Sequence, residues 1–252
     1  MRNAFARGLF ALSLTAFALS ARADEIQVAV AANFSAAAQK IAAQFEHDTG
    51  HVVKLSFGAT GKFYAQIEAG APFDVLLAAD QATPGRLVTE GKAIPTTLHT
   101  YAIGKLVLWS ADPGLVDAKG EVLKSDKWKH LSVADAKLAP YGQAARETLA
   151  ALKLTDAVQS RVVTAENIAQ AYQFVQTGNA ELGFIALGQV QPPDGGKAPG
   201  SIWLVPDELY APIKQDAVVI AATKSAKAAT EFVDYLASDK ARAVIKAYGY
   251  RW

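Results

Sequence analysis

The sequence predicts an α/β protein whose two lobes enclose a cleft. Stretches with the two-residue period of strands alternate with stretches of helical period along most of the chain. Two such sets occur, and two further strands, near 101–109 and 215–223, are placed to connect them. Such alternation builds mainly parallel sheets flanked by helices. We therefore expect a ligand to bind between the lobes, beyond the carboxyl ends of the strands.

The first 23 residues are expected to form a cleavable export signal. Arg2 and Arg7 precede an apolar run over 8–19, and a small-x-small site at 21–23 follows it. The run is shorter than a membrane span requires. The chain has no cysteine, which excludes disulfides and a lipid anchor on a cysteine. We therefore expect a periplasmic mature protein that begins at Asp24.

The charge and length of the mature chain limit its partners and its architecture. Removal of residues 1–23 takes away three cations and no acids, so the formal net charge changes from +1 to −2. Nucleic acids and anionic membranes select basic surfaces, and we expect neither as a partner. The remaining 229 residues can build two modest lobes. We place lobe I at 24–105 plus 217–252 and lobe II at 106–216, in a monomer.

The first half of the chain is predicted to form three strand–helix units. Their elements are a strand at 26–31, a helix at 36–45, a strand at 52–57, a helix at 63–69, a strand at 73–78 and a helix that ends near residue 91. The first helix places Ala37, Ile41 and Phe45 on one face. The third strand is apolar, as in a strand buried on both faces. Asp80 is suited to cap the third helix.

The second half repeats this pattern after the connecting strand at 101–109 and an irregular polar segment at 112–127. The expected elements are strands at 131–134, 161–164 and 182–185, helices at 143–152 and 168–177, a loop at 191–200, the second connecting strand at 215–223, and helices at 226–237 and 240–247. The two halves thus contribute two joints each at which a strand runs into a helix.

These four joints hold the candidate binding residues Asn33, Thr60, Tyr141 and Ile168. The first N–H groups of a helix are unpaired and lie at the positive end of its dipole, which favours an anion. Asn33 and Thr60 add side-chain donors, although both residue types also cap helices. Tyr141 is flanked by a proline and a glycine, so that its N–H or its hydroxyl could turn inward, and Ile168 can donate only through its main chain. Together the joints predict an anion site made of neutral donors.

The motifs of enzymes and metal sites do not occur in the sequence. The segment 58–63 has two residues between its glycines and no Ser or Thr after the lysine, unlike a phosphate-binding P-loop. The histidines, His47, His51, His99 and His130, show no metal-binding spacing. No GxSxG elbow or cysteine nucleophile is present. We therefore expect no catalytic residue, no side-chain metal ligand and no cofactor.

Four segments of the mature chain carry a family resemblance: VAVAANFSAAAQKIAAQF, LSFGATGKFYAQIEAGAPFDVLLAADQ, LAPYGQAA and ELGFIALGQV. With the leader, they resemble the periplasmic molybdate-binding proteins of ABC importers, and QIEAGAPFDVLLAAD is the most specific of them. The resemblance implies a two-lobed periplasmic-binding-protein clamshell, molybdate or tungstate held between the lobes, and a membrane permease that receives the loaded protein.

The resemblance also implies a role for each joint. Asn33 stands where the family commonly has a serine donor, and Thr60 stands where a second serine binds the anion through its hydroxyl and N–H. Tyr141 and Ile168 match residues that donate their main-chain N–H groups. Ala186 departs from the pattern, because many members have a tyrosine there whose hydroxyl contacts the anion. The Tyr141 hydroxyl, which comes from a different loop, is a candidate to replace it.

Three alternatives remain open at this point. The same fold could bind sulfate, thiosulfate or phosphate, and phosphate would need an acceptor carboxylate in the cleft. An organic-solute receptor would usually place Arg or Asp at the joints and aromatic walls around the ligand. A periplasmic enzyme would need a general base within hydrogen-bond reach of the substrate. The similar size of molybdate and tungstate leaves the choice between them open as well.

Overall fold

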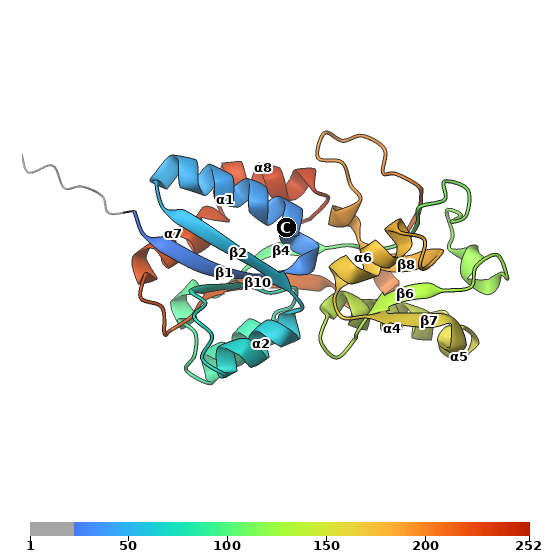
Figure 1. The fold of residues 1–252 in the computed structure, drawn as a ribbon, viewed down its shortest axis with the longest axis horizontal. Coiled ribbons are helices and arrows are strands. Elements are labelled where there is room, and N and C mark those ends of the chain that lie inside the picture. Colours follow the sequence, from blue (N-terminus) through green and yellow to red (C-terminus); the bar gives the residue numbers. More distant parts are fainter. Residues whose placement is uncertain (1–22) are drawn as a thin grey trace, which may run out of the picture.

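The computed structural model describes residues 23–252 as two lobes that lie side by side (Figure 1). Each lobe is built on one five-stranded sheet flanked by helices, so the predicted α/β clamshell is confirmed. The expected signal peptide, residues 1–23, lies outside the described part of the chain except for its last residue. Among the described residues, no helix has the length and apolar character needed to cross a membrane.

The first sheet has the strand order β2-β1-β3-β10-β4. Its strands are β1 (Glu25–Ala31), β2 (Val52–Gly58), β3 (Val75–Leu77), β4 (His99–Gly104) and β10 (Ile213–Val219). The accompanying helices are η1 (Ala32–Phe34), α1 (Ser35–Thr49), α2 (Thr60–Glu68), α3 (Ala82–Thr89), η2 (Pro95–Thr97), α7 (Ala226–Tyr235) and α8 (Asp239–Ala247). The predicted face of α1 is buried against this sheet with α7 and α8.

The second sheet has the order β7-β6-β8-β5-β9. Its strands are β5 (Leu106–Ser110), β6 (Leu131–Ala134), β7 (Val162–Ala165), β8 (Leu182–Ala186) and β9 (Ser201–Leu204). Its helices are η3 (Glu121–Lys124), α4 (Pro140–Ala151), α5 (Thr155–Val158), η4 (Gln159–Arg161), α6 (Ile168–Gln176), η5 (Leu187–Gln189) and η6 (Asp207–Leu209).

Both sheets are mainly parallel, with one reversed strand next to an edge. In the first sheet β1 pairs in parallel with β2 and β3, and the reversed strand β10 pairs antiparallel with β3 and β4. In the second sheet β6 pairs in parallel with β7 and β8, and β5 is the reversed strand between β8 and β9. The parallel strands therefore direct their carboxyl ends, and the helices that follow, towards one edge of each sheet.

The connecting strands differ from the prediction. The single strand expected at 101–109 is two strands in different sheets, β4 and β5, which are separated at Lys105. The strand expected at 215–223 is β10, which begins at Ile213, ends at Val219 and lies wholly in the first sheet. The chain therefore crosses between the lobes at 104–106 and at 205–212, which we call the hinge. The expected lobe limits at 105 and 216 remain a prediction.

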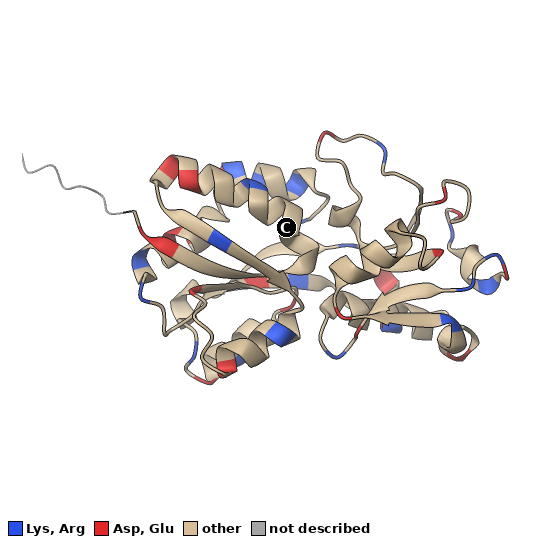
Figure 2. Cartoon of the chain, in the orientation of Figure 1, with Lys and Arg blue, Asp and Glu red and all other residues tan. Residues whose placement is uncertain are grey.

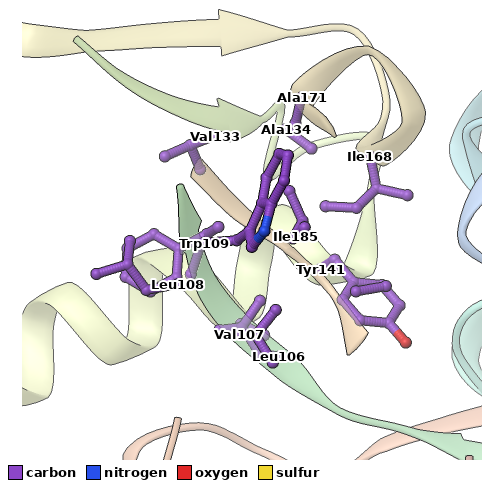
Figure 3. Packing of buried hydrophobic residues seen from close by; sticks show 14 of the residues in the cluster. Leu106, Val107, Leu108, Trp109, Val133, Ala134, Tyr141, Ile168, Ala171 and Ile185 are labelled. Atoms are coloured by element: carbon purple, nitrogen blue, oxygen red, sulfur yellow. The ribbon is translucent and has the colours of Figure 1, made fainter. Parts of the chain in front are cut away.

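Each lobe has its own hydrophobic core. The core of the second lobe surrounds β5 and β8, and Figure 3 shows Trp109, Ile185 and Ile168 packed within it. The ring of Tyr141 belongs to the same cluster, but its hydroxyl points away from the other labelled side chains (Figure 3). The helix α4 begins at Pro140, three residues before the predicted start, because a proline is well tolerated in a first helical turn. Tyr141 therefore lies in the first turn of α4.

Candidate functional site

The four predicted joint residues line one small cavity between the lobes. Asn33 and Thr60 come from the first lobe, and Tyr141 and Ile168 come from the second. All four are buried, with exposures between 1 and 4%. The cavity is small, with a volume of about 10 Å³, and is lined by Ala32, Asn33, Gly58, Ala59, Thr60, Ala79, Ala139, Pro140, Tyr141, Asn167 and Ile168. The structure thus brings together all four residues, although their part in ligand binding remains a prediction.

Thr60 is the first residue of α2, and only Ala59 separates it from the end of β2. Its hydroxyl oxygen accepts a hydrogen bond of 3.0 Å from the N–H of Ala79 and makes no capping bond to its own helix. Because the oxygen serves as the acceptor there, the hydroxyl hydrogen is free to donate to another group. The bond also fixes the side chain between the ends of two strands.

Asn33 lies in η1, which continues β1 into α1. Its side-chain nitrogen donates to Oε1 of Gln215 at 2.6 Å and to the hydroxyl of Tyr250 at 3.2 Å. The Tyr250 hydroxyl in turn donates to the carbonyl oxygen of Asn33 at 2.7 Å. The carboxamide hydrogens of Asn33, which the sequence suggested as donors to a ligand, are therefore bound to other residues of the protein. The donor that Asn33 can offer to a ligand is its main-chain N–H in η1. The residues Gln215 and Tyr250 were missed by the sequence reasoning.

Tyr141 and Ile168 lie at the starts of α4 and α6. Asn167 caps α6, because its Oδ1 accepts hydrogen bonds from the N–H groups of Ala169 at 2.9 Å and Gln170 at 3.1 Å. Gln189 donates to the carbonyl oxygen of Ile168 at 3.0 Å and holds the same turn from the other side. These contacts secure the turn while the N–H of Ile168 is left free.

The main-chain N–H groups of the four joint residues share one property. Within residues 23–252, none of them donates a hydrogen bond to another residue. Buried N–H groups almost always have a partner, so four free ones around one cavity indicate a place for an acceptor. Each also lies at or beside the positive end of a helix dipole. The cavity is therefore suited to an anion.

The hydroxyl of Tyr141 lies against the hinge. A Cβ atom added to Gly104 would lie 2.0 Å from this oxygen, so the hydroxyl occupies the space that a side chain at Gly104 would need. Burial raises the pKa of Tyr141 well above its ordinary value, and the hydroxyl therefore stays neutral. Ala186 is buried at the end of β8 and brings no donor side chain. A role for Tyr141 in replacing the missing hydroxyl at Ala186 remains a prediction.

The lining of the cavity carries no charged side chain. The part of the chain that the structure describes also contains no group of three or more His, Cys, Asp or Glu side chains that could hold a metal ion. Figure 2 shows Lys and Arg interspersed with Asp and Glu over both lobes. Charged side chains lie at the rim of the cavity, where Lys62 of α2 forms an ion pair with Glu166, just before α6. The N–H of Gly61 also donates to the carbonyl of Leu138 at 3.0 Å, so the lobes are in contact.

Comparison with known proteins assigns the family. The profile of a family described as "Bacterial extracellular solute-binding protein" matches residues 26–251. The chain belongs to this family. The molybdate-binding protein ModA of Azotobacter vinelandii is 56% identical over 250 residues, which cover 99% of each chain. A protein of the same name from Rhodobacter capsulatus is 48% identical over 244 residues, which cover 96% of this chain and 95% of the relative.

Solved structures support the same assignment. The periplasmic molybdate-binding protein of Azotobacter vinelandii matches with a TM-score of 0.88 and 42% identity, over 90% of this chain and 99% of that one. The sulfate-binding protein SubI of Mycobacterium tuberculosis matches with a TM-score of 0.72 at 15% identity, which indicates a shared fold only. The sequence-based assignment to the molybdate-binding solute-binding proteins is thus confirmed.

Proposed function

We propose that the chain is the periplasmic solute-binding component of an ABC importer and binds molybdate or tungstate between its lobes. The anion would accept hydrogen bonds from the N–H groups of Asn33, Thr60, Tyr141 and Ile168 and from the Thr60 hydroxyl. The observation that carries this proposal is the convergence of four unpaired helix-start N–H groups on one neutral, buried cavity. The anion is cargo, and the proposal assigns no reaction to the protein.

Neutral donors can hold a dianion without an arginine or lysine in contact with it. Each charge-assisted hydrogen bond contributes about 1.5–3 kcal/mol, and the helix dipoles add to it. A site that offers only donors disfavours protonated phosphate, because its O–H group would face another donor. Sulfate is fully deprotonated as well, so discrimination against it must come from the size of the cavity.

Closure of the lobes would connect binding to transport. Each lobe supplies two of the four donor residues, so only the closed arrangement of the lobes brings all four to the anion. The permease would then recognise the closed, loaded form. Export would require the signal peptide at 1–23, and we propose that the mature protein acts as a monomer. The relatives of 56% and 48% sequence identity are both named molybdate-binding proteins, which supports molybdate over the other oxyanions.

A titration of the mature chain, residues 24–252, tests this function. Molybdate, tungstate, sulfate, thiosulfate and phosphate would each be added while the thermal midpoint and the heat of binding are measured. A ligand that binds only the folded protein stabilises it by about 2.7 kcal/mol at a hundred times its dissociation constant. We expect stabilisation by molybdate and tungstate. No response to these two, with a response to sulfate, would contradict the proposal.

A further inference from the structure

A cluster of buried polar side chains connects the cavity to the hinge. It consists of Asn33, Tyr141, Gln215 and Tyr250, which are between 0 and 4% exposed. Asn33 and Gln215 are 182 residues apart in the chain but share the 2.6 Å hydrogen bond. Tyr141 comes from the other lobe. Because two of the four also line the cavity, the cluster can transmit the position of the hinge to the site.

The pairing of β10 with β4 is irregular at Gln215, and the extra residue, Tyr101, lies on β4. Gln215 pairs with Ala102 of β4, but the next residue, Asp216, pairs with Thr100, so the register shifts between them. Such a bulge changes the direction of the neighbouring side chain. Gln215 is fully buried, and its Oε1 accepts the hydrogen bond from Asn33. The irregularity therefore lies opposite Gln215, the residue of β10 that holds the Asn33 side chain of the candidate site.

Two polar atoms of the cluster have no hydrogen-bond partner among the described residues. They are the hydroxyl oxygen of Tyr141 and the Nε2 atom of Gln215. Both lie close to Gly104, since a Cβ atom added there would be 2.0 Å from the hydroxyl and 3.6 Å from Nε2. An unpaired buried polar group is costly, which makes it a candidate for a role outside stability. Gly104 thus leaves a notch at the hinge in which the two lobes meet.

We propose that Gln215 and the notch at Gly104 position the two hinge-side donors of the site. Gln215 holds Asn33 of the first lobe, and the notch receives the Tyr141 hydroxyl of the second lobe. When the lobes close, these two contacts set the separation between the N–H groups of Asn33 and Tyr141. This separation is one dimension of the cavity, so the contacts help to select the larger oxyanions over sulfate. The inference rests on the proposed function.

The substitution Gln215→Met tests the first contact. Methionine keeps the length of the side chain and removes the acceptor for Asn33. We expect molybdate to bind roughly 5- to 10-fold more weakly, and its preference over sulfate to fall. Gln81→Met is the control, because Gln81 bonds to Thr100 and Asp216 in the same sheet, whereas Gln215 bonds to Asn33.

A double-substitution cycle separates positioning from stability. If Gln215 acts through Asn33, Gln215→Met should change the affinity much less in an Asn33→Ala background. An equal effect in both backgrounds, or a lower thermal midpoint with unchanged affinities for molybdate and sulfate, would overturn the proposal. Failure of the unsubstituted protein to bind molybdate would instead contradict the proposed function.

Gly104→Ala tests the notch. The added methyl group would collide with the Tyr141 hydroxyl, and we expect roughly tenfold or greater loss of molybdate affinity. Tyr141→Phe removes the colliding atom, so it should restore part of the affinity in the double variant while costing less than about threefold alone. Gly85→Ala is the control, because a Cβ there meets nothing within 4 Å. No loss in Gly104→Ala, or no recovery in the double variant, would contradict the notch. A tenfold loss in Tyr141→Phe alone would show instead that the hydroxyl binds the anion.

Discussion

Single residues at the joints combine a structural contact with a free donor. The Thr60 hydroxyl oxygen accepts a hydrogen bond from the N–H of Ala79, and the hydroxyl hydrogen remains free to donate. The Asn33 side chain donates hydrogen bonds to Gln215 and Tyr250, whereas its main-chain N–H donates to no other described residue. A residue type can thus suggest a binding residue from the sequence, but it does not decide which atom of that residue contacts the ligand.

Thr60→Ala should weaken molybdate binding by about 1.5–3 kcal/mol, or roughly 10- to 150-fold. The substitution removes a hydroxyl that the structure leaves free to donate into the cavity, while the N–H remains. Titration calorimetry would measure the dissociation constant. Thr60→Ser is the matched control, because it keeps the hydroxyl and should bind nearly as well as the unsubstituted protein. An unchanged constant for Thr60→Ala would assign the hydroxyl to the contact with Ala79 alone.

The sequence predicts the site through local features and misses its distant contacts. Each joint has a strand, a short turn and a helix within about ten residues, so the position of the free N–H groups follows from local sequence. Gln215 and Tyr250 reach Asn33 across 182 and 217 residues, and no local pattern encodes such a pairing. Single-sequence reasoning lacks this tertiary information, and the partners of Asn33 were therefore not predictable.

At the scale of elements, the errors in the predicted boundaries have physical causes. The run 101–109 has strand composition throughout, but Lys105 pairs with Asp207 in the hinge and divides it into strands of two different sheets. The helix α4 starts at Pro140, because a proline at this position needs no hydrogen-bond partner. Local propensity therefore predicts whether a segment is a helix or a strand better than it predicts where the element ends or which sheet a strand joins.

The cap of α6 gives a prediction at this scale. Asn167→Ala removes the acceptor for Ala169 and Gln170 and should reduce the free energy of unfolding by about 0.5–2 kcal/mol. It should also weaken molybdate binding, because the freed turn carries the N–H of Ile168. Urea unfolding and calorimetry would measure the two effects.

The matched control for this prediction is Ser238→Ala. Ser238 caps α8 through a 3.2 Å hydrogen bond from the N–H of Ala241 and lies outside the cavity. We expect a comparable loss of stability without a change in affinity. If both variants bind molybdate equally well, the start of α6 does not contribute a donor.

For the whole molecule, the ion pair between Lys62 and Glu166 is a contact between the lobes at the rim of the cavity. Lys62→Gln and Glu166→Gln change the net charge in opposite directions but break the same pair. Exposed pairs contribute about 0.2–1 kcal/mol, so each variant should release molybdate roughly 1.4- to 5-fold faster in stopped-flow experiments. High salt should reduce the difference by screening.

The two variants distinguish a closure contact from a simple attraction between Lys62 and the anion. If attraction dominates, Glu166→Gln removes a negative charge near the site and should slow release. Slower release from Glu166→Gln would therefore contradict the closure role, whereas faster release from both variants would support it.

Alkaline pH should destabilise the protein. Burial raises the pKa values of Tyr101, Tyr141 and Tyr250 above the ordinary value of 10.0. Since the folded state holds these protons more tightly than the unfolded state, the stability is fully present below about pH 10 and decreases as the pH rises above it. A thermal midpoint measured across this range should decline, and Tyr141→Phe should reduce the decline. A level midpoint above pH 10 would contradict this expectation.

The lining of the cavity has a consequence for the exchange of protons. None of its side chains titrates near neutral pH, because its one ionisable group is the Tyr141 hydroxyl, whose pKa burial raises further above the ordinary value of 10.0. Capture of a fully deprotonated oxyanion should therefore neither take up protons nor release them. The measured heat of binding should then be the same in buffers of different ionisation enthalpy. Such a carrier would deliver its cargo without adding to or drawing on the proton balance of the compartment in which it works.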